Sequence, residues 1–130
     1  MCLVLELCAK GSLEDFLENT LRVLTWVGDL LPIATGLARG MAYLHGQEPP
    51  LVHRDLKPAN VLLADDWTPK VADMGTAMEM DEGAGERMAG SGSPLFQAPE
   101  VLRREQADQM CDVWSYGCVL CCLSTRSHPY

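Results

Sequence analysis

The hydrophobic pattern of this 130-residue chain predicts a core made mainly of helices. One helix is expected to end near His45, with a buried stripe of apolar residues at helical spacing: Ile33, Leu37, Met41 and Leu44. Residues 112–123 are almost wholly apolar, which predicts a helix that is buried on all sides. Val101 and Leu102 are expected to begin a shorter helix.

The start of the longer helix depends on Pro32. A helix that began at Trp26, with Thr25 as its cap, would contain Pro32 in its interior. Proline there would remove a backbone hydrogen bond and clash with the preceding turn. We therefore expect either a kink or a start near Leu30 with Asp29 as the cap.

The first thirty residues also contain a shorter capped helix. Ser12 and Asp15 stand three positions apart, which is typical of a capping box and predicts a helix over residues 13–17. Residues 18–20 are polar and are expected to end it.

Strands are predicted in three places. Residues 4–7 are apolar and predict a buried strand, and residues 61–63 and 69–72 predict a short two-stranded ribbon that turns at residues 65–66. Residues 75–93 are rich in glycine and small side chains, which predicts a mobile loop.

The charge and the hydropathy of the chain argue against some classes of binding partner and of membrane attachment. The net charge of −8 argues against a nucleic acid or an anionic membrane surface, because either would need a basic face. Residues 1–9 are apolar, but Glu6 interrupts them and the stretch is too short for a signal peptide or a membrane helix. Cys2 follows the first Met, so myristoylation is not expected.

The six cysteines are expected to be reduced thiols in the cytoplasm. Cys118 and Cys121 have C-x-x-C spacing, but no second such pair completes a zinc ligand set. The pair also falls within the apolar helical stretch, where cysteine behaves as a small buried apolar residue.

The strongest chemical pattern is His53-Arg54-Asp55-Leu56-Lys57-Pro58-Ala59-Asn60. Phosphoryl transfer needs a carboxylate for the substrate hydroxyl, a cation for the transferred group and an oxygen ligand for magnesium. Asp55, Lys57 and Asn60 supply these three groups on one loop. The stretch resembles the catalytic loop of the eukaryotic protein kinases.

Further motifs of that family follow in the family's order. Val71-Ala72-Asp73-Met74-Gly75 resembles the magnesium-binding D-F-G motif, with Met in place of Phe, and residues 92–100 resemble the end of the activation loop. Residues 112–117 resemble the start of the buried large-lobe helix, whose Asp ties down the catalytic-loop backbone. The resemblance extends upstream, to a hinge strand in residues 1–11 and to the helix that ends at His45.

The resemblance implies a fold and a set of cofactors. The fold class expected is α+β and mainly α-helical: a partial protein-kinase-like large lobe with a short β ribbon, the small lobe being absent. The expected division is a hinge strand at residues 1–11 and a large-lobe core at residues 12–130. ATP and Mg²⁺ are the expected cofactors and a protein the expected substrate.

The resemblance also assigns residues to the nucleotide and the metal. Asp55, Lys57 and Asn60 would be catalytic. Asn60 and Asp73 would hold magnesium. The nucleotide would contact Lys57, Asn60, Asp73, the hinge residues Glu6 and Cys8, and Leu62 on the floor of the pocket, with Leu5 as gatekeeper.

Regulation and substrate class follow from the same resemblance. Lys57 two residues after Asp55, together with Ser93, is typical of serine/threonine kinases, and tyrosine specificity stays open. Arg54 is expected to pair with a phosphate on the activation loop, with Ser91 preferred over Thr76 as the carrier.

The glycine-rich loop and the strand lysine of the family are not found in these residues. We therefore expect a middle piece of a kinase domain that is inactive alone, with apolar faces left exposed. The open alternative is a noncatalytic kinase-like interaction module that binds a partner through such a face.

Overall fold

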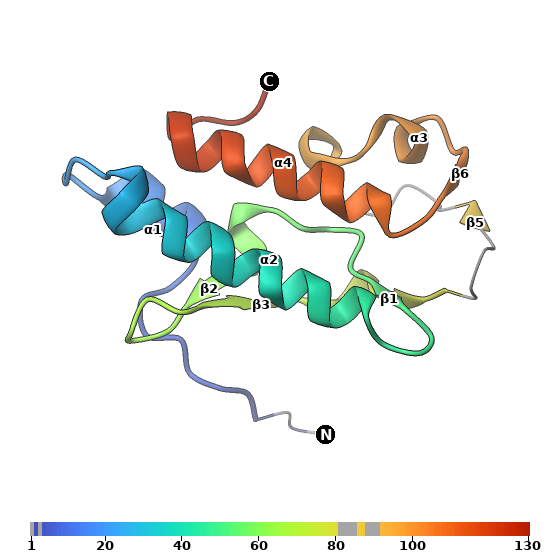
Figure 1. Ribbon diagram of the computed structural model, residues 1–130, viewed down its shortest axis with the longest axis horizontal. Coiled ribbons are helices and arrows are strands. Elements are labelled where there is room, and N and C mark those ends of the chain that lie inside the picture. Colours follow the sequence, from blue (N-terminus) through green and yellow to red (C-terminus); the bar gives the residue numbers. More distant parts are fainter. Residues whose placement is uncertain (1, 3, 81–85, 88–91) are drawn as a thin grey trace.

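The computed structural model describes residues 2, 4–80, 86–87 and 92–130. Helices dominate this part of the chain, and Figure 1 labels them: α1 Leu13–Asn19, α2 Leu31–His45, α3 Pro99–Leu102 and α4 Met110–Thr125. Short 3-10 turns lie at Pro58–Asn60, Met74–Thr76 and Pro94–Phe96. The predicted fold class, α+β and mainly helical, is confirmed.

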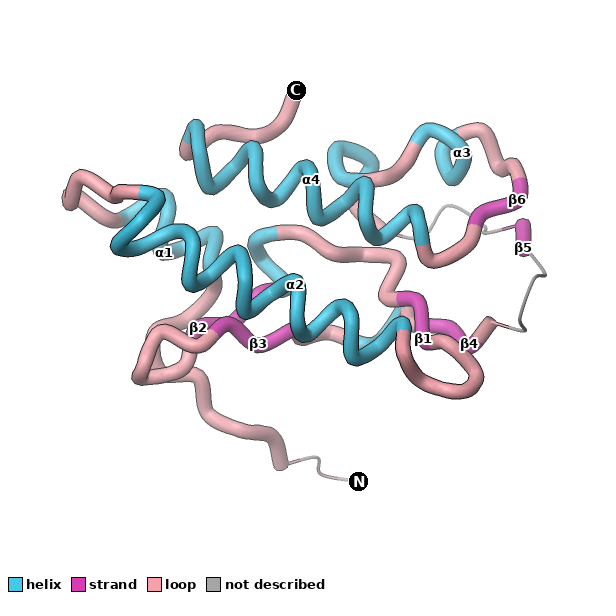
Figure 2. Tube along the Cα trace, viewed as in Figure 1, coloured by secondary structure: helices cyan, strands magenta, loops and turns pink. Residues whose placement is uncertain are grey.

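The described strands are short and pair in antiparallel ribbons, which Figure 2 shows at the edges of the helical body. β2 (Val61–Leu63) pairs with β3 (Pro69–Val71), which confirms the predicted ribbon. Two further pairs were not predicted from the sequence: β1 (Leu51–Val52) with β4 (Met78–Glu79), and β5 (Glu86–Arg87) with β6 (Gln106–Ala107).

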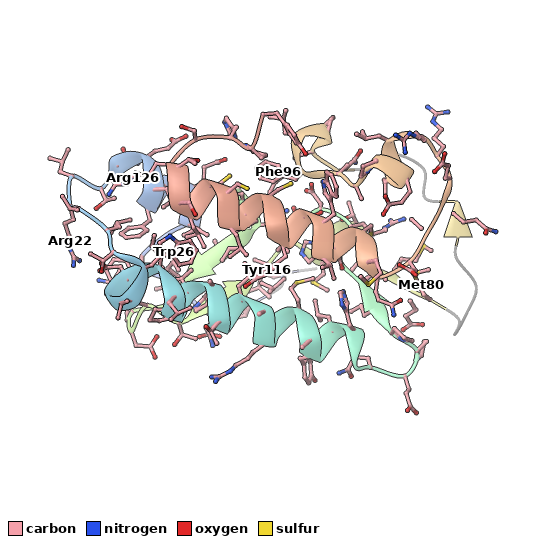
Figure 3. The ribbon with its side chains drawn as sticks, turned by 45° about the horizontal axis from the view of Figure 1, so that its top comes forward. Arg22, Trp26, Met80, Phe96, Tyr116 and Arg126 are labelled. Carbon is pink, nitrogen blue, oxygen red and sulfur yellow. The ribbon has the colours of Figure 1, made fainter. Side chains whose placement is uncertain are left out.

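The main core lies between α2, α4 and the β2–β3 ribbon. Helices α2 and α4 run side by side along the long axis (Figure 1), and the Tyr116 hydroxyl of α4 donates to the Ala34 carbonyl of α2 at 3.0 Å (Figure 3). The predicted stripe of α2 is buried at Ile33, Leu37 and Met41. Cys118 is buried in the same core, as predicted, whereas Cys121 is exposed.

Helix α2 lies unusually close to strand β3. A Cβ atom at Gly36 would stand 2.6 Å from Pro69 Cγ, and one at Gly40 would stand 3.1 Å from Val71 Cγ2. Only glycine allows the first approach, because real Cβ atoms do not come that near another carbon. This contact fixes the ribbon, and with it the loops at its two ends, against α2.

Helix α1 matches its prediction. The Ser12 hydroxyl accepts from Asp15 N at 3.0 Å, while the Asp15 carboxylate accepts from Ser12 N at 3.3 Å, so the capping box is complete. The helix continues two residues beyond the predicted end, to Asn19. Helix α3 begins at Pro99, before the predicted start, and already ends at Leu102.

The hinge strand predicted at residues 4–7 is wrong. Figure 2 shows these residues as a loop rather than a strand. Their side chains are exposed, Val4 by 90% and Leu7 by 84%. A strand needs a neighbour for its backbone groups. Among the described residues, the first backbone hydrogen bond to the β2–β3 ribbon comes at Lys10, whose N–H donates to Leu63 O at 3.2 Å.

The predicted Asp29 cap is also wrong. Thr25 caps a π-helical turn, Trp26–Leu30, that leads directly into α2, and the Asp29 carboxylate accepts from Thr25 N at 2.9 Å. Within this turn Leu31 N donates to Trp26 O, five residues back. The wider turn places Pro32 at the first turn of α2, where its missing N–H costs little.

Helix α4 is not buried on all sides. Its inner face carries Val119 and Leu123 into the core, but Met110 is 57%, Val113 47% and Trp114 40% exposed. The expected exposed apolar surface is therefore present on α4 and on residues 4–7. Among the described residues, no helix combines the length and the apolar character needed to cross a membrane.

The predicted loop at residues 75–93 is described only in part. It contains the end of a 3-10 turn, strand β4 and, at residues 86–87, strand β5. Residues 81–85 and 88–91 of the loop lie outside the described residues, and the mobility of the loop stays a prediction.

Candidate active site

The backbone of residues 53–54 is held by one buried carboxylate. Asp112, on the first turn of α4, is 1% exposed. Its Oδ2 accepts from His53 N at 2.8 Å and its Oδ1 from Arg54 N at 2.9 Å. His45, the last residue of α2, contributes its Nε2 to Asp112 Oδ2 at 2.9 Å. The expected tie between Asp112 and this loop is confirmed.

His53 links the loop to the segment that carries Asp73. Its ring Nδ1 accepts from Asp55 N at 3.3 Å, so its Nε2 carries the proton and donates to Ala72 O at 2.9 Å. The Thr76 hydroxyl donates to His53 O at 2.9 Å. These bonds hold the residues on either side of Asp55 and Asp73 in one fixed arrangement.

The Asp55 carboxylate is surrounded by donors. Its Oδ2 accepts from Lys57 Nζ at 2.9 Å and from Asn60 Nδ2 at 3.0 Å, and its Oδ1 accepts from Ser93 N at 2.8 Å. Burial raises the pKa of this carboxyl, but the bonds from Lys57, Ser93 and Asn60 outweigh burial, and the pKa lies below its ordinary value. Asp55 is therefore an anion at neutral pH.

Lys57 connects Asp55 to Ser93, in the segment that resembles the end of the activation loop. Its Nζ donates to Ser93 Oγ at 2.8 Å as well as to Asp55, and its side chain is 24% exposed. The ammonium is therefore partly exposed to solvent, and an anionic group can approach it.

Asn60 and Asp73 lie at the same end of the β2–β3 ribbon, where Val61 pairs with Val71. Ala72 N donates to Asn60 O at 2.9 Å, which brings Asp73, the next residue, to the end where Asn60 lies. Asn60 Nδ2 donates to Asp55 O at 2.8 Å, so the amide oxygen points away from Asp55. Asp73 is exposed and has the left-handed backbone angles φ 59° and ψ 70°.

This pair fits the magnesium that the resemblance implies. Mg²⁺ prefers oxygen ligands and usually keeps one or two carboxylates or amides together with substrate phosphates and water. An amide oxygen and an exposed carboxylate on adjoining segments match that ligand type.

A groove of about 890 Å³ lies beside this pair. It is bounded by the extended first residues, by α2 and by β3, and it brings together four of the predicted nucleotide contacts: Glu6, Cys8, Leu62 and Asp73. Leu5 and Met74 also line it, whereas Lys57 and Asn60 do not. Its size and mostly apolar lining fit a flat heterocycle.

The hinge groups that would face a nucleotide have partners in the structure. Cys8 O accepts from Gly11 N at 3.1 Å, and Glu6 Oε1 lies 3.3 Å from Lys70 Nζ. A carbonyl has two acceptor positions, so Cys8 O keeps one for a ligand.

Arg54 differs from its neighbours in having a left-handed backbone, with φ 68°. Its Nε donates to Thr76 O, and its Nη1 lies 3.6 Å from Met78 Sδ. Of the predicted regulatory residues, Ser93 is part of the Asp55 cluster and Ser91 lies outside the described residues.

Two residues of the site were missed by reasoning from the sequence. The sequence predicts His45 as the end of a helix, and it predicts Gly92 as part of a glycine-rich loop and as the first residue of the segment that resembles the end of the activation loop. Their contacts with Asp112 and Asp55 depend on segments far apart in the chain, so no local pattern indicates them.

Comparisons with known proteins show the family to which the chain belongs. The family model for the protein kinase domain matches residues 1–130, and the chain belongs to the protein kinase family. It is 36% identical over 130 residues, all of this chain, to the probable serine/threonine-protein kinase drkB of Dictyostelium discoideum, and covers 18% of that protein.

Two further relatives have related names. A second probable serine/threonine-protein kinase of Dictyostelium discoideum is 42% identical over 126 residues, 97% of this chain and 13% of its own length. Mitogen-activated protein kinase kinase kinase 13-B of Xenopus laevis is 37% identical over 129 residues, 99% of this chain and 13% of its own length. The chain spans between 8% and 20% of the length of the first relatives.

Proposed function

We propose that this chain carries the phosphoryl-transfer site of a serine/threonine kinase, which moves the γ-phosphoryl group of ATP to a protein hydroxyl. The observation that carries the proposal is the Lys57 ammonium, which bridges Asp55 Oδ2 at 2.9 Å and Ser93 Oγ at 2.8 Å. A carboxylate and a cation are thereby fixed side by side, as transfer of a phosphoryl group to a hydroxyl requires.

In this proposal Asp55 orients the substrate hydroxyl and accepts its proton. Its lowered pKa keeps it charged at neutral pH, and the donors from Lys57 and Asn60 fix its plane. Lys57 offsets the negative charge on the transferred group, since its ammonium is accessible at the edge of the site.

Asn60 and Asp73 are the residues that would hold magnesium. When bound, the metal offsets the charge of the nucleotide phosphates. The adenine would lie in the groove beside Leu62, with the backbone of Glu6 and Cys8 as hydrogen-bonding groups and Leu5 at the back. These roles are supported by the shared groove and by the bond between Ala72 N and Asn60 O.

The experiment uses a chimera in which residues 1–130 replace the matching residues of the drkB kinase, after the unmodified host has been shown to transfer phosphate. The chimera is incubated with γ-labelled ATP and a mixed protein substrate, and the labelled amino acids are identified. We expect phosphoserine and phosphothreonine. Label on tyrosine alone would contradict the serine/threonine assignment, and no label would contradict the kinase proposal.

Arg54 is proposed to respond to a phosphate on the activation loop, carried by Ser91. The Thr76 hydroxyl already donates to His53 O at 2.9 Å, which supports Ser91 over Thr76 as the carrier. We further propose that residues 1–11 act as the hinge, that residues 12–130 form the large-lobe core, and that the protein works in the cytoplasm.

The alternative function, a noncatalytic interaction module, is favoured by one observation. Met110, Val113 and Trp114 form an exposed apolar face on α4. The chimera separates the two proposals, because a binding module has no need of Asp55, whereas a kinase loses its turnover without it.

A further inference from the structure

Gly92 adopts a backbone conformation that side chains rarely allow. Its φ is +114°, and a Cβ atom built there would stand 2.9 Å from Arg54 O, 3.0 Å from Asp55 Oδ1 and 3.2 Å from Gln97 Nε2. The first two neighbours belong to the catalytic loop. Neither Arg54 O nor Asp55 Oδ1 can move away easily, because Asp112 accepts from Arg54 N and three donors hold the Asp55 carboxylate.

The close approach has a direct chemical consequence at the next residue. Ser93 N donates to Asp55 Oδ1 at 2.8 Å, and Ser93 Oγ accepts from Lys57 Nζ at 2.8 Å. Both bonds require the backbone at Gly92 to pass against the carboxylate. A methyl group at Gly92 would occupy the space between Arg54 O and Asp55 Oδ1, so either Asp55 or the segment that carries Ser93 must move.

We propose that Gly92 is a positioning residue for Asp55: the absence of its side chain lets Ser93 N donate to Oδ1, and this bond, together with the two donors on Oδ2, fixes the carboxylate that would meet the substrate hydroxyl. The inference rests on the proposed function for its catalytic part. Its structural part, the dependence of the Ser93–Asp55 bond on Gly92, can be measured without turnover.

The structural part is tested by NMR on the 130-residue chain with labelled Asp carboxyl carbons and amide nitrogens. In the unmodified chain we expect a scalar coupling across the hydrogen bond between the Ser93 amide nitrogen and the Asp55 carboxyl carbon, because Ser93 N donates to Asp55 Oδ1 at 2.8 Å. In Gly92→Ala we expect this coupling to be lost, because the added methyl group separates the two partners.

Gly117→Ala is the matched control, because a Cβ atom there meets nothing within 4 Å. It should leave the coupling between Ser93 N and the Asp55 carboxyl carbon unchanged. If Gly92→Ala does not fold, the unmodified chain still decides the question, since the absence of this coupling there overturns the proposal. A coupling of unchanged size in a folded Gly92→Ala chain overturns it as well.

The catalytic part is tested in the drkB chimera. Gly92→Ala should lower kcat by about 10²-fold, the typical cost of misplacing a catalytic group by about 1 Å. The KM for ATP should stay unchanged, because Gly92 does not line the nucleotide groove. Asp55→Asn serves as reference. If Asp55→Asn has no effect, the proposed function fails; if Asp55→Asn is inactive but Gly92→Ala keeps full kcat, only the Gly92 inference fails.

Discussion

His45 Nε2 and Asp112 Oδ2 lie 2.9 Å apart, and this contact joins the last residue of α2 to the first turn of α4. The same Asp112 carboxylate holds the backbone N–H groups of His53 and Arg54. His45 therefore contacts the loop that carries Asp55 indirectly, through the Asp112 carboxylate. A change at His45 should reach the proposed catalytic carboxylate through Asp112.

Replacing His45 by Leu should destabilise the chain. The buried carboxylate would lose a donor, which costs about 1–3 kcal/mol when a buried polar group is left without its partner. His45→Gln keeps an N–H donor and should recover part of the loss. Urea unfolding measures the free energy, and amide exchange at His53 and Arg54 reports whether the loop is loosened. Equal stability of the Leu variant and the unmodified chain would show that the contact contributes nothing.

The 130-residue chain alone should bind magnesium ATP weakly. The groove beside Leu62 is open, and its hinge segment, with Leu5 75% exposed, has few contacts to hold it in place. We expect a dissociation constant on the order of 1 mM, which corresponds to about 4 kcal/mol. Calorimetry tests this, with Asp73→Asn expected to bind still more weakly and Asp66→Asn, in the turn of the ribbon, as control. Micromolar binding with measurable turnover would contradict it.

Local patterns predicted the parts of the fold that local bonds determine. The Ser12–Asp15 capping box, the stripe on α2 and the β2–β3 ribbon each depend on residues that are near in sequence, and all three were predictable. The strand at residues 4–7 was predicted wrongly because a strand also needs a neighbour. The sequence could not indicate that these residues would remain unpaired.

In the candidate site, too, residues that form a local motif were predictable and residues that act through distant contacts were not. Asp55, Lys57 and Asn60 were predictable because their spacing is itself the motif, and the structure joins them through Asp55 Oδ2. Gly92 and His45 were not, since their importance arises from contacts across the fold. The pairing of β1 with β4 was missed for the same reason.

Arg54→Ala and Ser91→Ala should each lower the activity of the chimera after its activation loop has been phosphorylated. A phosphate paired with a guanidinium can order the loop. Within the described part of the chain, the Arg54 guanidinium contacts the Thr76 carbonyl and the Met78 thioether, which are neutral groups. Mass spectrometry before and after phosphatase treatment identifies the modified residue. Full activity of the dephosphorylated protein and of both variants would remove Arg54 from any regulatory role.

The cysteines should differ sharply in reactivity toward a thiol reagent at pH 8. Burial, together with the neighbouring Asp112 carboxylate, raises the pKa of Cys111 to about 12, and burial raises that of Cys122 to about 11. Both therefore remain protonated at pH 8, and the thiolate is the reactive form. Cys2 and Cys121 are exposed and should react first. Rapid labelling of Cys111 in the folded chain would contradict the packing of α4.

Turnover of the Asp55→Asn chimera tests the central claim most directly. Asparagine keeps the size of the side chain but cannot accept the proton of the substrate hydroxyl, so kcat should fall by about 10²–10⁴-fold. The affinity for magnesium ATP should be unchanged, because Asp55 does not line the nucleotide groove. The matched Asp66→Asn variant should keep full turnover. If Asp55→Asn transfers phosphate as fast as the unmodified chimera, Asp55 is not the catalytic carboxylate.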